Sequence, residues 1–277
     1  MSYLRFDKTL MTNLQVSLQK EILRSNRSGA YSCSTIVDCN TRKYHGLLVV
    51  PIPQLDSENH VLLSSLDTTV IQHGAEFNLG LHKYQGDNFS PRGHKYIREF
   101  DSLQVPTTLY RVGGVILKRE QMFQHFENRI FIRYTLMEAT SETTLRLQPF
   151  LAFRSVREFT HENSVASREY QIVQNGIKTR MYDGYPDLFM QINKENEFVF
   201  RPDWYRGVHI QRGTRTIRTI SAEISTRHSR CAKSGTNNVG RVSVNRRIDG
   251  LSCRSELQMV VGQYLRKSKT MCQPQAS

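Results

Sequence analysis

Short segments with alternating apolar and polar residues constrain the fold of this chain more than any other feature. In the segment 129–137, every second residue from Ile130 to Leu136 is apolar or aromatic, which is the period of a strand with one buried face. Similar segments are 44–50, 61–71, 75–84, 108–112, 115–123, 144–153, 170–173, 177–181, 188–192 and 198–200. Strands at about 8–12 residue spacing without helical crossovers predict an antiparallel β-sandwich.

Turn signals fix the order of several of these strands. Gly113-Gly114 predicts a two-residue hairpin turn, because both positions of such a turn favour positive φ. Asn175-Gly176 is a still stronger signal of the same kind. A third hairpin is predicted around residues 194–196.

One helix is predicted, over residues 14–23, where Leu14, Leu18 and Ile22 share a face. A helix of this length is marginal by itself. The sequence therefore predicts an all-β fold, a large antiparallel β-sandwich occupying residues 1–208.

A dense group of polar residues precedes one predicted strand. Its members are Asp38, Asn40, Thr41, Arg42, Lys43, Tyr44 and His45. The buried strand 47–50 follows directly, and Pro51 ends it. Hydrogen-bonding side chains anchored to a rigid strand suit a ligand covered in hydroxyl groups.

This segment resembles a signature in the N-terminal domain of bacterial and archaeal glycogen debranching enzymes, Asn-Thr-Arg-Arg-Tyr-His-Gly-Leu-Leu-Val. Here Lys43 replaces the second Arg, and upstream Arg27 and Ser28 stand where the family often has Gly or another small residue. Further similar segments follow in the family's order: 96–100, 106–110, 133–134, 147–149, 153–161 and 202–205. The resemblance covers about residues 15–208.

The resemblance implies a supersandwich-like domain that packs against a C-terminal (α/α)6 barrel. In the family, that barrel holds the catalytic carboxylates for 4-α-glucanotransferase and amylo-α-1,6-glucosidase activity. The resemblance covers the N-terminal domain without the barrel, so the expected partners are glycogen or another α-glucan and the absent barrel. No catalytic residue is assigned, since Glu158, Asp183 and Asp187 show no pairing suited to glycoside hydrolysis. The chain alone is expected to be inactive, and no cofactor is expected.

The residues expected to contact glucan are Asn40, Arg42, Tyr44, His45 and Trp204. The aromatic rings of Tyr44 and Trp204 can stack on a sugar, although core packing explains them equally well. His45 is alternatively a structural hydrogen-bonding residue. Arg42 is alternatively a surface charge or a partner of Asp38.

The chain changes character at His209. Residues 209–277 contain 13 lysines and arginines against 3 acidic residues, so they carry +10 of the formal net charge of +13. They hold one aromatic residue, Tyr264, and three of the five cysteines. Such a composition predicts a disordered basic tail. We interpret it as out-of-frame sequence, and a natural basic tail is the alternative.

Composition bounds the remaining possibilities. The first 13 residues are too polar for a signal peptide, and no apolar run approaches the ~20 residues of a membrane helix. Cys33 and Cys39 lack metal-ligand spacing, so no metal is expected. Free thiols are typical of a cytoplasmic protein, which is the location we expect. A stand-alone carbohydrate-binding module is one alternative function. Nonspecific nucleic-acid binding through the tail is another, less favoured because the tail has one aromatic residue and no recognised motif.

Overall fold

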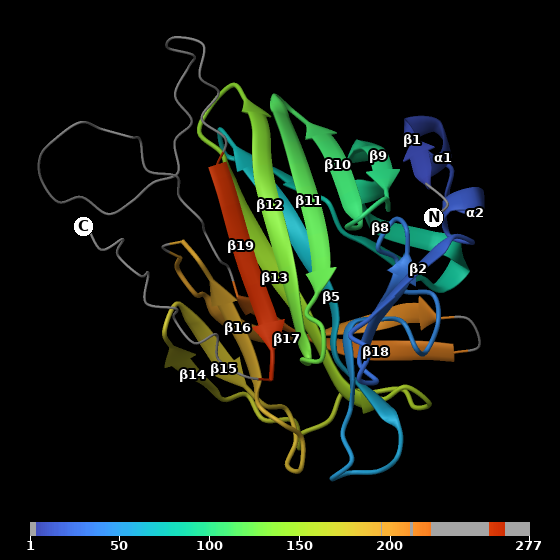
Figure 1. The fold of residues 1–277 in the computed structure, drawn as a ribbon, viewed down its shortest axis with the longest axis vertical. Helices are drawn as coiled ribbons and strands as arrows, with labels where there is room; N and C mark the ends of the chain where they lie inside the picture. The colour runs from blue at the N-terminus through green and yellow to red at the C-terminus, as the bar shows by residue number, and fades with distance from the viewer. Residues whose placement is uncertain (1–3, 195, 211–212, 223–254, 264–277) are drawn as a thin grey trace, which may run out of the picture.

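Two large antiparallel sheets stack face to face in the computed structural model, which describes residues 4–194, 196–210, 213–222 and 255–263 (Figure 1). The nine-stranded sheet has the order β1 (Arg5–Asp7), β9 (Ile97–Asp101), β10 (Thr107–Val112), β11 (Val115–Phe123), β12 (Arg129–Ala139), β19 (Ser255–Gly262), β16 (Leu188–Ile192), β15 (Gly176–Thr179) and β14 (Tyr170–Val173). The described residues therefore form the predicted all-β sandwich.

The second sheet has ten strands. Its order is β2 (Glu21–Ser25), β3 (Tyr31–Thr35), β4 (Gly46–Pro51), β5 (Asn59–Gln72), β13 (Thr144–Ser155), β18 (Gly213–Ala222), β17 (Phe200–Ile210), β7 (Leu81–Tyr84) and β8 (Asn88–Arg92), with β6 (Ala75–Asn78) paired to β5. The helices are short: α1 (Lys8–Thr12), α2 (Leu14–Ser17), η1 (Gln85–Asp87) and η2 (Gly93–Tyr96). No helix in the described part of the chain is long and apolar enough to cross a membrane.

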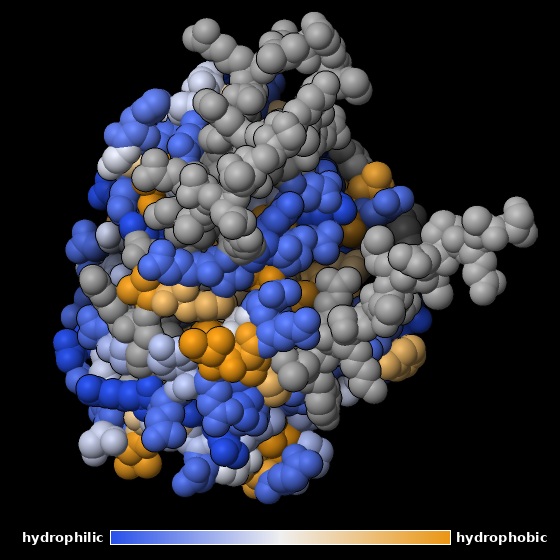
Figure 2. Space-filling model, turned by 90° about the vertical axis from the view of Figure 1, so that its left-hand side faces the viewer, coloured by the Kyte–Doolittle hydropathy of each residue, from blue (hydrophilic) through white to orange (hydrophobic). Residues whose placement is uncertain are grey.

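The core lies between the sheets and follows the predicted alternation. Ile130, Ile132 and Tyr134 of β12 are buried in it. The hydroxyl of Tyr134 shares a hydrogen bond of 2.7 Å with Thr68 of β5, which ties one sheet to the other. The outer surface differs: from the side of β14, Figure 2 shows mainly hydrophilic side chains with small apolar groups between them.

Two of the three predicted hairpins are confirmed. Val112 pairs with Val115 across Gly113-Gly114, and Gly113 has φ +56°. In the β14–β15 hairpin Val173 pairs with Gly176, so the turn begins one residue earlier than predicted and Asn175 has φ +55°.

The third predicted hairpin is wrong. The strand β16 pairs with β15 and β19 in the nine-stranded sheet, whereas β17 pairs with β18 and β7 in the other sheet. The connection between β16 and β17 thus crosses from one sheet to the other. A short polar turn signal does not distinguish a hairpin from such a crossing.

The predicted helix over residues 14–23 is also wrong beyond its first turn. Only Leu14–Ser17 is helical, and Glu21–Ser25 forms β2, which pairs with β3 along its whole length. A helix this short gains little by itself, whereas the strand pairing satisfies the same backbone groups and points Ile22 inward.

Parts of residues 209–277 are strands in the structure, and their lack of stability, which limited proteolysis would test, stays a prediction. Residues 213–222 form β18 between β13 and β17, and residues 255–262 form β19 between β12 and β16. Leu257, Met259 and Val261 of β19 are buried in the main core. Residues 211–212, 223–254 and 264–277 of the tail lie outside the described residues, so the boundary at residue 208 and the out-of-frame origin stay predictions.

Candidate functional site

The polar group found in the sequence forms the loop 36–45 between β3 and β4. The loop begins with a tight turn, in which the hydroxyl of Thr35 accepts a hydrogen bond from the Cys39 amide at 3.0 Å and donates one to its carbonyl at 2.9 Å. Asp38 takes a left-handed conformation in this turn, with φ +58°. Asp and Asn tolerate this region better than most residues.

Asn40 anchors the middle of the loop beneath the surface. Its side-chain amide donates to the carbonyl of Ser64 on β5 at 2.8 Å, and its oxygen accepts from Ser34 at 2.8 Å. The residue is buried. Its hydrogen-bonding groups are therefore engaged in holding the loop to two strands.

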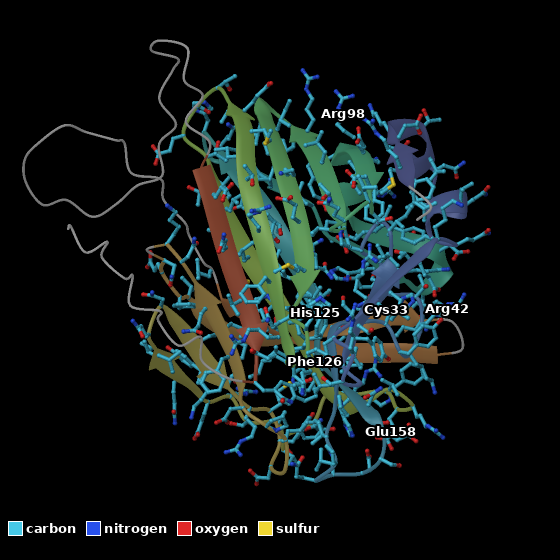
Figure 3. All side chains as sticks on the ribbon, in the orientation of Figure 1. Cys33, Arg42, Arg98, His125, Phe126 and Glu158 are labelled. Atoms are coloured by element: carbon cyan, nitrogen blue, oxygen red, sulfur yellow. The ribbon has the colours of Figure 1, made fainter. Side chains whose placement is uncertain are left out.

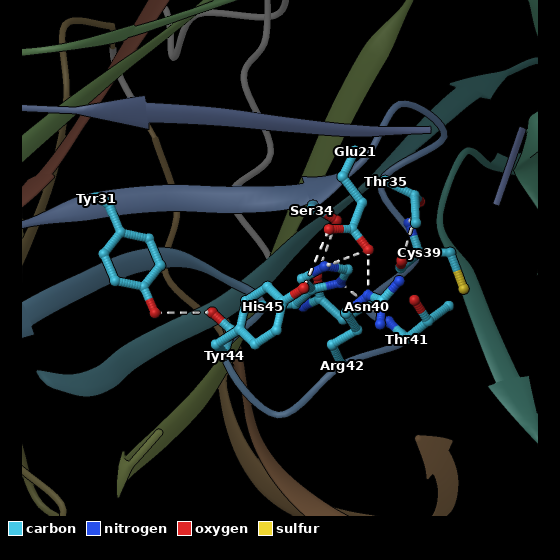
Figure 4. Close-up of polar contacts among 10 residues, drawn as sticks. All are labelled: Glu21, Tyr31, Ser34, Thr35, Cys39, Asn40, Thr41, Arg42, Tyr44 and His45. Atoms are coloured by element: carbon cyan, nitrogen blue, oxygen red, sulfur yellow. Dashed lines mark hydrogen bonds and ion pairs between the residues drawn. The ribbon is translucent and has the colours of Figure 1, made fainter. Parts of the chain in front are cut away.

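Glu21 of β2 contacts three residues in the second half of the loop (Figure 4). Its carboxylate accepts a hydrogen bond from Nε of Arg42 and another, of 3.2 Å, from the hydroxyl of Tyr44. Nε2 of His45 lies 3.4 Å from Oε1 of the same carboxylate. Three of the five candidate residues are thus brought together by a residue that the sequence did not single out.

The register of β2 explains why Glu21 was missed. It pairs with Thr35 at the end of β3, which places its side chain over the loop. In the predicted helix over residues 14–23, Glu21 would not pair with β3 and would not be placed over the loop. Figure 3 shows Arg42 beside Cys33 at this end of the molecule, far from Arg98.

Electrostatics favour the ionised form of Glu21. Burial raises its pKa, but the hydrogen bond and the charge of Arg42, with the hydrogen bond from Tyr44, hold the pKa below its ordinary value of 4.5. The hydrogen bond with Glu21 in turn raises the pKa of Arg42. The pair is therefore a charged hydrogen bond at neutral pH.

One cluster in the described part of the chain has the residue types of a metal site. The donor atoms of Glu21, Cys33 and His45 lie within 4.8 Å of one another. However, Nδ1 of His45 accepts the amide hydrogen of Thr41 at 3.1 Å, so the neutral ring carries its proton on Nε2. Burial and the charge of Glu21 raise the pKa of the Cys33 thiol to about 11. A metal on Nε2 of His45 would have to displace that proton while Nδ1 keeps the hydrogen bond from Thr41, so the hydrogen bonds of the ring do not fit a metal ligand.

A second loop supports the first. The buried guanidinium of Arg154 donates to the carbonyl of Lys43 at 2.7 Å, and to those of Ser155 and Glu158 at 2.9 and 3.0 Å. Burial lowers the pKa of Arg154 to about 10. Nζ of Lys43 lies 4.3 Å from the ring centroid of Phe159. Loops 42–45 and 156–159, both within segments that resemble the family, therefore form one continuous surface.

Asp38 does not pair with Arg42. It forms an ion pair with Arg119 of β11, at the border of a polar cavity of about 50 Å³ between the sheets. This volume is enough for a few water molecules, since one water needs roughly 10–15 Å³. The first half of the loop is thus fixed to the opposite sheet.

Trp204 does not join the other candidates. It lies on β17, which three strands separate from β4 in the sheet, and it is buried in the main core. The surface of the loop is formed instead by Arg42, Lys43 and Tyr44, while Asn40 and His45 lie beneath it.

Comparison with known proteins now identifies the family. A family model described as the glycogen debranching enzyme N terminal matches residues 20–216. The chain belongs to this family. The match includes Glu21, the loop 36–45 and the supporting segment 154–159.

Other comparisons add little to this assignment. No curated protein matches the chain. A solved structure of a polysaccharide lyase is similar with 10% identity over 88% of this chain and 32% of the lyase, at a TM-score of 0.29. The chain spans about a third of the lyase's length. A likeness at this TM-score supports no conclusion on fold or function.

Proposed function

We propose that this glycogen debranching enzyme N-terminal domain supplies a glucan-contacting surface for the breakdown of glycogen or a related α-glucan. The supporting observation is the clustering around Glu21, which fixes the guanidinium of Arg42 and the ring of Tyr44 at the surface. A planar donor can bind the hydroxyl groups of a glucosyl unit, and an aromatic face can stack on its ring. Asn40 and His45 act from beneath by holding the loop.

In this proposal the hydrolytic and transfer steps belong to a catalytic barrel, as the family resemblance implies. The continuous surface of loops 42–45 and 156–159 is the part that faces both the glucan and the barrel. The chain alone is then inactive toward a branched limit dextrin, and it works in the cytoplasm, where a glycogen substrate would be met.

The test is affinity electrophoresis of the full chain in native gels with and without glycogen. The wild-type protein is expected to be retarded by glycogen, and Arg42→Ala and Tyr44→Ala are expected to migrate more freely without a large change in melting temperature. Arg111→Ala, which removes an exposed arginine from β10, is the matched control and should be retarded like the wild type.

Absence of retardation of the wild type would refute the proposal. So would equal retardation of the loop variants and the control. If the loop variants lose several degrees of melting temperature but keep their affinity, the loop serves the fold only.

A further inference from the structure

An apolar groove crosses the outer face of β2 and β3, next to the Glu21 cluster. It has a volume of about 560 Å³ and is lined by Glu21, Leu23, Ser25, Arg27, Tyr31 and Tyr44, with Cys33 in its floor. We propose, building on the proposed function, that this groove is a binding subsite for a short segment of an α-glucan chain. Pockets that hold small molecules commonly measure about 300–1,000 Å³.

Strand register explains how the groove arises. In β2, Glu21, Leu23 and Ser25 point outward, whereas Ile22 and Arg24 point to the inside. Leu23 pairs with Cys33, and Ser25 pairs with Tyr31, so the outward side chains of both strands share one face. Leu23 is 60% exposed. Leu23 thus places an apolar side chain between Glu21 and Ser25 on an outer face where the fold alone would favour polar residues.

The aromatic wall of the groove is fixed before any ligand arrives. Tyr44 is 41% exposed, its hydroxyl is held by Glu21, and its ring meets the His45 ring edge-on at 5.1 Å. The hydroxyl of Tyr31 donates to the Tyr44 carbonyl at 3.1 Å. Since both side chains are already ordered, a sugar that stacks on the Tyr44 ring avoids much of the usual entropy cost of binding.

The floor of the groove favours a neutral occupant, and the positive charge of Arg27 lies at one end, in the β2–β3 turn. The carboxylate of Glu21 is neutralised by Arg42. Burial raises the pKa of Tyr31 to about 12 and that of Cys33 to about 11, so the floor carries no charge at neutral pH. An uncharged polyol with apolar ring faces and hydroxyl edges fits an uncharged floor between hydrogen-bonding ends.

The experiment is calorimetric titration of the full chain with maltoheptaose, a linear α-1,4-linked glucan. Leu23→Glu puts a charge in the groove and removes the apolar contact, and it should weaken binding about fivefold, which equals ~1 kcal/mol for covering the exposed part of one leucine. Leu103→Glu is the control, because Leu103 is 54% exposed in the β9–β10 connection, outside the groove. It should bind like the wild type.

The outcomes separate this inference from the proposed function. If Leu23→Glu binds like the wild type while Arg42→Ala still loses glycogen, the groove is not the subsite and the proposed function stands. Binding of glycogen without measurable binding of maltoheptaose also overturns the inference. A change in sedimentation mass without a change in affinity identifies a self-association surface instead. If the wild type binds neither glucan, both proposals fail.

Discussion

The ion pair between Asp38 and Arg119 allows a sharp test of what holds the loop to the sandwich. Arg119 is buried, with 8% of its side chain exposed, whereas 38% of the Asp38 side chain is exposed. Burial lowers the pKa of the Arg119 guanidinium. The charge of Asp38, with the neighbouring tyrosines, outweighs burial and raises this pKa. Removing the carboxylate charge therefore leaves a buried cation that does not lose its proton.

The change Asp38→Asn isolates this charge. Asn tolerates the positive φ at this position and keeps an oxygen that accepts a hydrogen bond from Arg119. Breaking a buried ion pair costs about 3–5 kcal/mol, and the retained hydrogen bond favours the lower end, ~3 kcal/mol. For a domain of this size that corresponds to a fall in melting temperature of about 6–12 °C.

The reciprocal change should cost less. Arg119→Met leaves Asp38 without its partner, but water reaches the exposed part of that carboxylate, so we expect about 1–2 kcal/mol. The double variant should be close to Arg119→Met, which gives a favourable coupling energy in the double-mutant cycle. Urea unfolding followed by fluorescence measures all three free energies.

Two results would refute this reasoning. A loss below about 1 kcal/mol for Asp38→Asn would mean that the pair behaves like a surface salt bridge. A greater loss for Arg119→Met than for Asp38→Asn would mean that burial of the arginine is not the dominant cost.

The other predictions concern Glu21 and Arg154. Because the pKa of Glu21 is lowered in the fold, its stabilising contribution is complete above the unfolded pKa near 4.5 and is lost as pH falls through the folded pKa. The difference in unfolding free energy between wild type and Glu21→Gln should therefore shrink from pH 7 to pH 3, and a constant difference in urea titrations would contradict this. Arg154→Ala should cost about 3 kcal/mol by leaving carbonyls such as that of Lys43 without a donor, and it should speed amide exchange in loops 42–45 and 156–159. Unchanged exchange in both loops would exclude the supporting role of Arg154.

The sequence predicted local features well because strands with one buried face have a clear period. The face of β12 that carries Ile130 and Ile132 and the hairpin at Gly113-Gly114 were readable without any long-range information. The loop was also recognised from its polar residues. What the sequence could not supply was the residue across from them, since Glu21 reaches the loop only through the pairing of β2 with β3.

Burial was the second property that residue types did not reveal. Tyr44 and Trp204 are both aromatic residues next to charged neighbours, yet Tyr44 is exposed and Trp204 belongs to the core. The difference arises from the sheet, because Trp204 faces the opposite sheet from β17, while Tyr44 stands on a loop at the edge of the sandwich. Neither position is encoded by the few residues around it.

The tail shows how an average composition conceals a short strand. Residues 209–277 are strongly basic as a whole, but β19 pairs with both β12 and β16. Every second residue of this strand from Leu257 to Val261 is apolar and buried in the main core. The family match ends at residue 216, inside β18, so β19 lies beyond it. A chain that ended at residue 208 would leave the facing edges of β12 and β16 unpaired, and those of β13 and β17 as well. Because unpaired edges in the middle of two sheets expose both backbone groups and core, we expect a chain cut after residue 208 to be less stable than one that keeps residues 213–222 and 255–262.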